Sequence, residues 1–182
     1  MILNNEKFAD GLYKVNHKIF KDERGTFEII FNNEVLSKNL LFNPIQSNIV
    51  KSKLNVFRGM HFQTENYSQN KLVTVIKGEI DDYVVDLRKN SQTFLKTFKI
   101  NISEFSDFSI FISKGFAHGY HVKSEYSIVQ YHIDNYYSSI HERTINFRDK
   151  KINIFIKNDG LIISSKDNRG IFLDEYLKEN KF

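Results

Sequence analysis

Short runs rich in Phe, Tyr, Ile and Val recur along the chain, and turn-forming residues separate them at short intervals. This spacing is typical of an all-β sandwich or barrel. Segment 71–88 is expected to form two strands that meet near Gly78, because glycine readily adopts the conformations of tight turns. Helices are expected only at 33–41 and 174–180, where apolar residues recur with a helical period. Further strands are expected at 25–31, 56–63, 94–102, 108–113, 126–133 and 140–147, about ten in all.

The length and the residue types predict one domain that spans residues 1–182. At roughly 150 residues per domain, a chain of 182 residues supplies one well-packed core. No stretch approaches the ~18 consecutive apolar residues of a membrane span, and the polar start of the chain does not fit a secretory signal. Cys is absent, which excludes disulfides and thiolate metal ligands. We therefore expect a cytoplasmic protein with no membrane partner.

The positive charge of the chain is modest, with 26 Lys and Arg against 22 Asp and Glu and a net charge of +4. Acids interleave the basic residues, as in segments 21–24 and 141–143. Nucleic-acid-binding proteins instead concentrate their basic residues on one element or face. The distribution predicts an ordinary solvated surface and no nucleic-acid partner, whereas a small phosphorylated ligand would need only a few of these cations.

Three polar residues take positions that the strand pattern assigns to the interior. Side chains alternate between the two faces of a strand. Lys71 and Tyr131 share the parity of apolar residues in their strands, and His61 shares that of Phe57, with Arg58 on the opposite face. Each has an ordinary explanation, since a buried aromatic needs only a hydrogen-bond partner and a lysine near a strand end can extend to solvent. The three together favour a cavity lined by polar groups.

Two histidines lie close enough in sequence to be tested as metal ligands. His118 and His121 are three residues apart, which places them on opposite faces of a strand. Without Cys, a first-row transition metal would need His and carboxylate ligands from distant strands, and no spacing in the chain proposes such a set. The sequence therefore predicts neither a metal nor a cofactor.

A series of short motifs runs almost from end to end of the chain. The motifs occupy residues 20–25, 46–48, 58–63, 69–73, 85–88, 115–120, 130–131, 135–137 and 165–167. In this order and at this spacing, the sequence resembles the dTDP-4-dehydrorhamnose 3,5-epimerase family, which comprises cupin-fold enzymes of nucleotide-sugar metabolism. The resemblance implies an all-β cupin jelly-roll barrel with a few short helices. It also implies a homodimer with an active site inside each barrel.

The same resemblance implies a reaction and four catalytic residues. The substrate would be a nucleotide-diphosphate 4-keto-6-deoxy sugar, whose C4 ketone acidifies the hydrogens on C3 and C5. His61, in the motif RGxHxQ, matches the family's base, and Asp167, in the motif SxKD, matches the carboxylate that orients it. Such a carboxylate raises the basicity of the other imidazole nitrogen. Lys71 would stabilise the enolate oxygen, and Tyr131 would return the proton from the opposite face.

Further positions match residues that hold the nucleotide sugar in the family. Arginine is favoured there because its planar fork grips phosphate with two hydrogen bonds. Either of two adjacent tyrosines would stack on the base or the sugar. For three of the charged residues, at positions 24, 142 and 166, an ordinary solvated surface charge explains the residue type nearly as well as a ligand contact does. The full set is Arg24, Gln46, Asn48, Arg58, His118, Tyr136, Tyr137, Glu142 and Lys166.

Some positions depart from the family pattern and leave the nucleotide open. The family usually has Glu where this chain has Ile29, and the nearest acid, Glu28, has the opposite strand parity. Ser47 and His132 replace the usual Asp and Lys. Relatives of the family act on GDP-linked 4-keto sugars, including heptoses destined for surface polysaccharides. The resemblance therefore leaves dTDP and GDP, and hexose and heptose, as alternatives.

Other functions fit parts of the same pattern. An epimerase acting at C3 alone would share the fold and His61, whereas Tyr131 favours inversion at both carbons. A 3,4-ketoisomerase is another cupin that acts on sugar nucleotides, but the RGxHxQ and SxKD motifs favour the epimerase. A non-catalytic sugar-binding cupin would keep the arginines, yet it has no reason to keep His61, Lys71, Tyr131 and Asp167 together.

Overall fold

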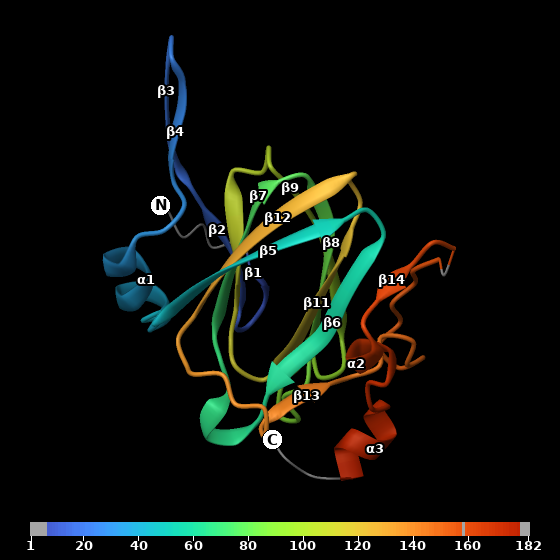
Figure 1. Ribbon diagram of the computed structural model, residues 1–182. Coiled ribbons are helices and arrows are strands. Elements are labelled where there is room, and N and C mark those ends of the chain that lie inside the picture. The colour runs from blue at the N-terminus through green and yellow to red at the C-terminus, as the bar shows by residue number, and fades with distance from the viewer. Residues whose placement is uncertain (1–6, 158, 179–182) are drawn as a thin grey trace.

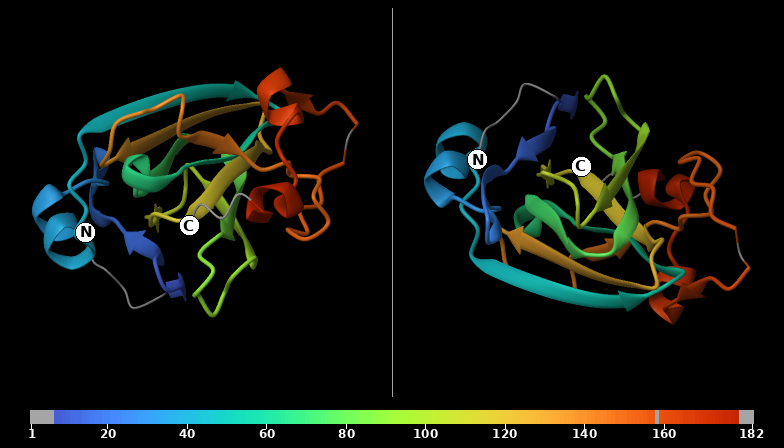
Figure 2. Two further views of the ribbon diagram at one scale, coloured as in Figure 1. Left: turned by 90° about the horizontal axis from the view of Figure 1, so that it is seen from below. Right: turned by 90° about the horizontal axis from the view of Figure 1, so that it is seen from above.

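Two sheets that face each other form the body of the molecule (Figures 1 and 2). The structure, a computed structural model, describes residues 7–157 and 159–178. The first sheet has the order β1-β2-β10-β7-β12-β5, and the second has the order β13-β6-β11-β8-β9, with β14 beside β6. The strands of the first sheet are β1 (Lys7–Ala9), β2 (Leu12–Asn16), β10 (Phe108–Ile112), β7 (Lys71–Lys77), β12 (Tyr126–Ile133) and β5 (Gln46–Lys53).

The second sheet carries the C-terminal part of the chain on its outer face. Its strands are β13 (Glu142–Thr144), β6 (Val56–Gln63), β11 (Phe116–Val122), β8 (Glu79–Asp86), β9 (Thr97–Ser103) and β14 (Ile162–Ile163). A separate hairpin consists of β3 (Lys18–Asp22) and β4 (Gly25–Ile29). The helices are short: α1 (Asn33–Leu40), the 3-10 turn η1 (Glu65–Tyr67), α2 (Ser165–Asn168) and α3 (Leu173–Lys178). The prediction of a mostly β fold with a few short helices is confirmed.

Three apolar clusters explain how the layers hold together. The largest lies between the sheets and includes Val73, Val84 and Ile110. A second packs the C-terminal segment and α3 against the outer face of the second sheet, and a third packs α1 against the first sheet. Figure 2 shows α1 and the C-terminal helices on opposite sides of the two sheets. The C-terminal segment therefore covers the outer face of the second sheet, whereas α1 covers only part of the first sheet, where Ile49 and Ile76 are exposed.

The agreement with the sequence predictions differs from one segment to the next. Strands at 56–63 and 126–133 have the predicted bounds, and helix 33–41 ends one residue earlier, at Leu40. Strand β9 begins at Thr97 instead of residue 94. Within segment 140–147, only Glu142–Thr144 forms a strand, and Ile145 adds an isolated bridge to Ile171. Residues 179 and 180 of the predicted C-terminal helix lie outside the described residues.

Several strands had no clear signal in the sequence. Strand β5 is the last strand of its sheet and is largely exposed. Its sequence, QSNIVKSK, is therefore mostly polar and lacks the apolar run of a typical strand. Strand β11 reads FAHGYHV and is buried along its whole length, so it lacks the alternation of polar and apolar residues that marks a half-buried strand. The prediction therefore missed strands at both extremes of burial.

The hairpin β3–β4 projects away from the body of the molecule (Figure 1). Phe20 and Phe27 lie on it with their ring centroids 6.1 Å apart, and they are 47% and 66% exposed. At its base, the buried His17 contacts Ser109 through Nε2 at 2.8 Å and Glu28 through Nδ1 at 3.2 Å. The base of the hairpin is thus fixed to the first sheet, while its far end contributes little to the core.

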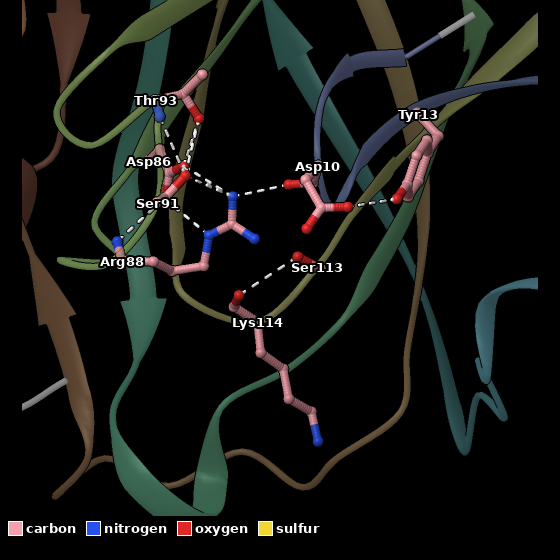
Figure 3. A network of polar contacts seen from close by, with 8 residues as sticks. All are labelled: Asp10, Tyr13, Asp86, Arg88, Ser91, Thr93, Ser113 and Lys114. Atoms are coloured by element: carbon pink, nitrogen blue, oxygen red, sulfur yellow. Dashed lines mark hydrogen bonds and ion pairs between the residues drawn. The ribbon is translucent and has the colours of Figure 1, made fainter. Parts of the chain in front are cut away.

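A buried carboxylate organises the connection from β8 to β9. Asp86 accepts hydrogen bonds from Arg88 Nε at 2.8 Å, Ser91 Oγ at 2.6 Å and Thr93 Oγ1 at 2.6 Å (Figure 3). Arg88 Nη2 also donates to the backbone oxygen of Asp10 at 2.7 Å. This network joins the turn after β1 to the β8–β9 connection at the edge of the barrel.

No helix within the described ranges is long and apolar enough to span a membrane.

Candidate active site

A pocket of about 300 Å³ lies between the two sheets. The first sheet contributes residues of β5, β7 and β12, and the second contributes residues of β6, β11 and β13. The pocket therefore has one wall from each sheet. Its lining residues are Gln46, Asn48, Val50, Arg58, His61, Phe62, Gln63, Gln69, Lys71, His118, Gly119, Tyr120, Tyr131, Ile133, Tyr137 and Glu142.

His61 and Asp167 form a hydrogen-bonded pair at one wall of this pocket. The imidazole Nε2 lies 2.6 Å from Asp167 Oδ1, and Asp167 Oδ2 accepts from the backbone NH of Gly59 at 3.3 Å. Because a carboxylate can only accept, Nε2 carries the hydrogen and Nδ1 keeps its lone pair. Ser164 caps helix α2 and accepts a hydrogen bond from the backbone NH of Asp167, which holds the buried carboxylate behind the ring.

The electrostatics of Asp167 favour its charged form. Burial by itself would raise the pKa of this carboxyl, but the hydrogen bond and the charge interaction with His61, together with the NH of Gly59, hold the pKa below its ordinary value. A carboxylate that stays charged stabilises the imidazolium that forms when His61 takes a proton. The pair therefore has the arrangement of a general base and its orienting group.

A bulge in β6 brings Arg58 and His61 to the same pocket. His61 pairs with His118 and Arg58 pairs with Tyr120, so a step of two residues on β11 matches a step of three on β6. The extra residue reverses the strand parity between the two side chains. The prediction that His61 shares its face with Phe57, and that Arg58 lies opposite, is therefore wrong, and Phe57 packs in the outer cluster instead.

Two glycines allow the close approach of the strands at this bulge. Gly59 has a φ of +138°, and a Cβ added to it would lie 2.5 Å from the Cα of Gly119 on β11. Any other residue at position 59 would clash with the backbone of the neighbouring strand. The glycine of the RGxHxQ motif is thus required by the geometry that places Arg58 and His61 together.

Lys71 enters the pocket from the start of β7 in the opposite sheet. Burial lowers the pKa of its ammonium from 10.5 to about 8, although Asp82 and Glu142 oppose the shift. Its Nζ lies 3.4 Å from the backbone oxygen of His61. A poorly hydrated cation at this position would interact strongly with a negative charge that forms in the pocket.

Tyr131 lies on β12, beside β7, and faces the same pocket. Burial is the main reason why the pKa of its phenol is raised above the ordinary value, with Arg58 acting in the opposite direction. The hydroxyl therefore stays protonated at neutral pH. The interior placement predicted for Lys71, His61 and Tyr131 is confirmed, because all three line the one pocket.

Glu142 is the centre of a polar cluster at the edge of the pocket. Tyr137 donates to its Oε2 at 2.8 Å, and Lys166 forms an ion pair with its Oε1. Burial would raise the pKa of Glu142, but Lys166, Tyr137 and the charge of His61 hold it below the ordinary value. Lys166 is adjacent to Asp167 in α2, so this ion pair also connects α2 to β13.

Three predicted ligand residues do not line the pocket. Arg24 lies at the tip of the projecting hairpin, where it is exposed and forms an ion pair with Asp22 at 2.6 Å. Tyr136 is 69% exposed and its neighbour Tyr137 takes the place in the pocket wall. The third is Lys166, which contacts Glu142 instead, and the other six predicted ligand residues line the pocket.

Sequence reasoning gave no role to several residues that the structure places in or under the pocket. Gln63 is buried and donates to the backbone oxygens of Tyr67 at 2.7 Å and Tyr136 at 3.0 Å, and it accepts from the NH of Ser138 at 2.6 Å. It therefore holds the loop that carries Tyr137. Its position as the last residue of the RGxHxQ motif was the one sequence feature that could have pointed to this role. Gln69, Tyr120 and Asp82 also belong to this group.

No group of three or more His, Asp or Glu side chains that could hold a metal ion occurs among residues 7–157 and 159–178.

The side chains around the pocket form a set suited to proton transfer. One sheet supplies the base His61, which Asp167 of α2 supports, and the other sheet supplies a cation and a protonated phenol, Lys71 and Tyr131. This set can remove a proton from a carbon, stabilise the resulting anion, and return a proton from the facing wall.

Comparisons with known proteins agree with this geometry. The model of the family described as dTDP-4-dehydrorhamnose 3,5-epimerase matches residues 7–175. The dTDP-4-dehydrorhamnose 3,5-epimerase of Shigella flexneri is 40% identical over 155 residues, 84% of this chain and 86% of the relative. The protein of that name from Escherichia coli strain K12 is 38% identical over 165 residues, 88% of this chain and 89% of the relative.

A solved structure extends the similarity to three dimensions. It is the dTDP-6-deoxy-D-glucose-3,5-epimerase of Legionella pneumophila in complex with dTDP-4-keto-L-rhamnose. This chain resembles it with a TM-score of 0.90 at 31% sequence identity, over 97% of this chain and 95% of that chain. The cupin jelly-roll fold expected from the sequence is confirmed.

Proposed function

The chain belongs to the dTDP-4-dehydrorhamnose 3,5-epimerase family, and on that premise we propose that it inverts C3 and C5 of a nucleotide-diphosphate 4-keto-6-deoxy sugar. It is an isomerase, of the class of epimerases that act on carbohydrates. The substrate is a dTDP-linked hexose or a GDP-linked hexose or heptose, and the product serves the synthesis of surface polysaccharides. Residues 1–182 act as one catalytic domain.

One observation carries the proposal. His61, backed by Asp167, faces the pocket from one sheet, while Lys71 and Tyr131 face it from the other. Inversion at a carbon next to a ketone needs a base on one side of the carbon and an acid on the other. It also needs a positive charge near the ketone oxygen. The pocket holds one group suited to each of these tasks.

The reaction begins when His61 removes the proton from C3 or C5. The electron pair of the C–H bond moves into the ring and onto the C4 oxygen, which gives an enolate. Asp167 keeps Nε2 protonated, so Nδ1 receives the proton, and the carboxylate then stabilises the imidazolium. The ammonium of Lys71 stabilises the enolate oxygen, and it is already in place before charge develops.

Inversion is completed from the facing wall. Tyr131 donates its phenolic proton to the carbon, on the face opposite to His61, and the enolate electrons return to form the new C–H bond. The raised pKa of Tyr131 keeps the phenol protonated until the enolate is formed. Proton exchange with water then restores neutral His61 and protonated Tyr131. The same cycle at the second carbon completes the product.

The nucleotide diphosphate lies between the polar groups of β5 and the arginines. Gln46, Asn48 and Arg58 line the pocket beside the catalytic groups. Arg24 reaches a substrate only if it comes from a second chain, because it lies on the projecting hairpin of its own chain. We therefore propose a homodimer in which each hairpin contributes Arg24 to the site of the other subunit.

Deuterium incorporation in D2O tests the proposed reaction. The protein is mixed separately with dTDP- and GDP-linked 4-keto-6-deoxy hexoses and heptoses, and the products are analysed by mass spectrometry and NMR. Label at C3 and C5 of one sugar is the expected result, and it identifies the nucleotide. Label at C3 alone would replace the proposal with a C3 epimerase, and a product with its ketone at C3 would replace it with a 3,4-ketoisomerase. Saturable binding without label in any sugar would indicate a non-catalytic sugar-binding cupin.

A mixing experiment tests the shared site. Arg24→Ala removes the arginine of the hairpin, and His61→Ala removes the base, so homodimers of either variant have two defective sites. A mixed dimer has one site with both residues intact. Co-refolding the two variants is expected to restore about half of the activity per mixed dimer, while a mixture with no gain over the separate variants would contradict the role of Arg24 in the partner's site.

A further inference from the structure

A second buried carboxylate, Asp82, contacts a residue of the pocket wall. Asp82 belongs to β8, and its neighbours on the same face, Ile80 and Val84, are part of the apolar cluster between the sheets. Its exposed fraction is 0%. A carboxylate buried in apolar surroundings has a large desolvation cost, so a chain tolerates it only with compensating partners.

The partners of Asp82 are groups of the pocket. Its Oδ2 lies 2.7 Å from Nε2 of His118, which lines the pocket from β11. Its Oδ1 is buried and has no hydrogen-bond partner within the described residues. Oδ2 of Asp82 is therefore hydrogen-bonded to His118, whereas Oδ1 accepts no direct hydrogen bond from the described residues.

Asp82 is the acid that most strongly favours the charged form of Lys71. Among the groups that raise the pKa of Lys71 against the effect of burial, Asp82 comes first and Glu142 second. The other titratable or charged groups that line the pocket come from β6, β11, β12 and the loop before β13. They are Arg58, His61, His118, Tyr120, Tyr131 and Tyr137.

We propose that Asp82 is a positioning residue for the reaction: its Oδ2 holds His118 in the pocket wall, and its unpartnered Oδ1 places a negative charge beside the pocket that Lys71 also lines. This inference rests on the proposed function. A buried ammonium next to a site where an enolate forms must stay charged in the free enzyme as well as during the reaction. A fixed carboxylate next to the pocket achieves this, and Asp82 is fully buried and does not itself line the pocket.

The substitution Asp82→Asn tests the proposal, because it keeps the shape of the side chain and removes its charge. Asp81→Asn is the matched control. It makes the same change at the preceding residue of β8, on the opposite face of the strand, where Asp81 pairs with Lys99 at 3.0 Å. The first measurement is the NMR titration of the Lys71 side chain without substrate, which is independent of any epimerase activity.

We expect the Lys71 titration midpoint, about 8 in the wild type, to fall by about one unit or more in Asp82→Asn and to stay unchanged in Asp81→Asn. Equal midpoints in the two variants would overturn the proposal. If Asp82→Asn does not fold, Asp82→Ser makes the same test with a smaller uncharged side chain. Circular dichroism establishes which variant is folded.

The pH profile of deuterium exchange is the second measurement. A lysine loses its charge above its pKa, so a lower pKa moves the alkaline limb of kcat/KM to lower pH by the same amount. The limb is expected to move in Asp82→Asn and to remain in place in Asp81→Asn. A loss of activity at all pH values with an unmoved limb would overturn the proposal, since it would indicate a purely structural role. Absence of exchange in the wild type would refute the proposed function, while the Lys71 titration would still decide the role of Asp82.

Discussion

Replacing Asp167 by asparagine changes one atom of the pair behind His61 and reverses the direction of its hydrogen bond. The backbone NH of Gly59 can only donate, so the amide oxygen of the new side chain turns toward Gly59, where Oδ2 of Asp167 accepts at 3.3 Å. The amide NH2 then faces Nε2 of His61, which Asp167 holds at 2.6 Å. An NH2 group donates, and Nε2 must then accept. The hydrogen of the ring moves to Nδ1, and His61 has no lone pair left for the substrate.

The size of the effect follows from the loss of the base in its correct tautomer. General-base catalysis and the fixed tautomer together predict a fall in the exchange rate of about 10³- to 10⁴-fold, or about 4 to 5.5 kcal/mol in the activation barrier. The nucleotide should bind nearly as well as in the wild type, because Asp167 is buried behind the ring and does not line the pocket.

The assay is the rate of deuterium incorporation at C3 and C5, with nucleotide diphosphate affinity measured by calorimetry. Asp149→Asn is the matched control, since Asp149 is also buried and accepts from the NH of Leu173 at 2.7 Å at the start of α3. That control is expected to lower stability and leave the exchange rate per folded molecule unchanged. Exchange in Asp167→Asn within about tenfold of the wild type would refute the tautomer argument, because general-base catalysis is worth at least about 10²-fold.

Three further outcomes follow from the site and the fold. In Tyr131→Phe, deuterium exchange should persist while inversion, followed by NMR, falls by about 10²-fold or more; inversion at the wild-type rate would exclude Tyr131 as the acid. Gln63→Leu removes the hydrogen bonds that hold the loop of Tyr137 and should raise KM about tenfold with a smaller change in kcat, as steady-state kinetics would show. Asp86→Ala breaks a buried network and should lower the free energy of unfolding by about 3 to 5 kcal/mol at pH 7 in urea titrations. Burial alone would raise the pKa of Asp86, but its hydrogen bonds with Arg88, Ser91 and Thr93 lower it, so this stabilisation is present above the ordinary pKa of aspartate and should shrink as the pH falls through the lowered value.

The sequence alone was enough to predict the class of fold and the inward direction of the groups that suit proton transfer. Strand parity placed Lys71 and Tyr131 inside correctly, because the pairing of β7 with β12 is regular from Lys71 to Val75 and from Val129 to Ile133. The inward placement needed only local periodicity. The chemistry expected of these groups came instead from the order and spacing of the motifs, which resemble those of the 3,5-epimerase family.

Other parts of the site depend on tertiary structure. The bulge at Gly59 reverses the parity of β6 and brings Arg58 beside His61, and its position is set by the contact with Gly119 on a neighbouring strand. Asp82 looks like an ordinary polar residue of its strand until β11 places His118 against it. The hairpin carries the arginine at position 24 away from the pocket of its own chain, although its residue type is suitable. Strand pairing, register and hairpin direction arise from contacts between residues far apart in the sequence, and local periodicity carries no information about such contacts.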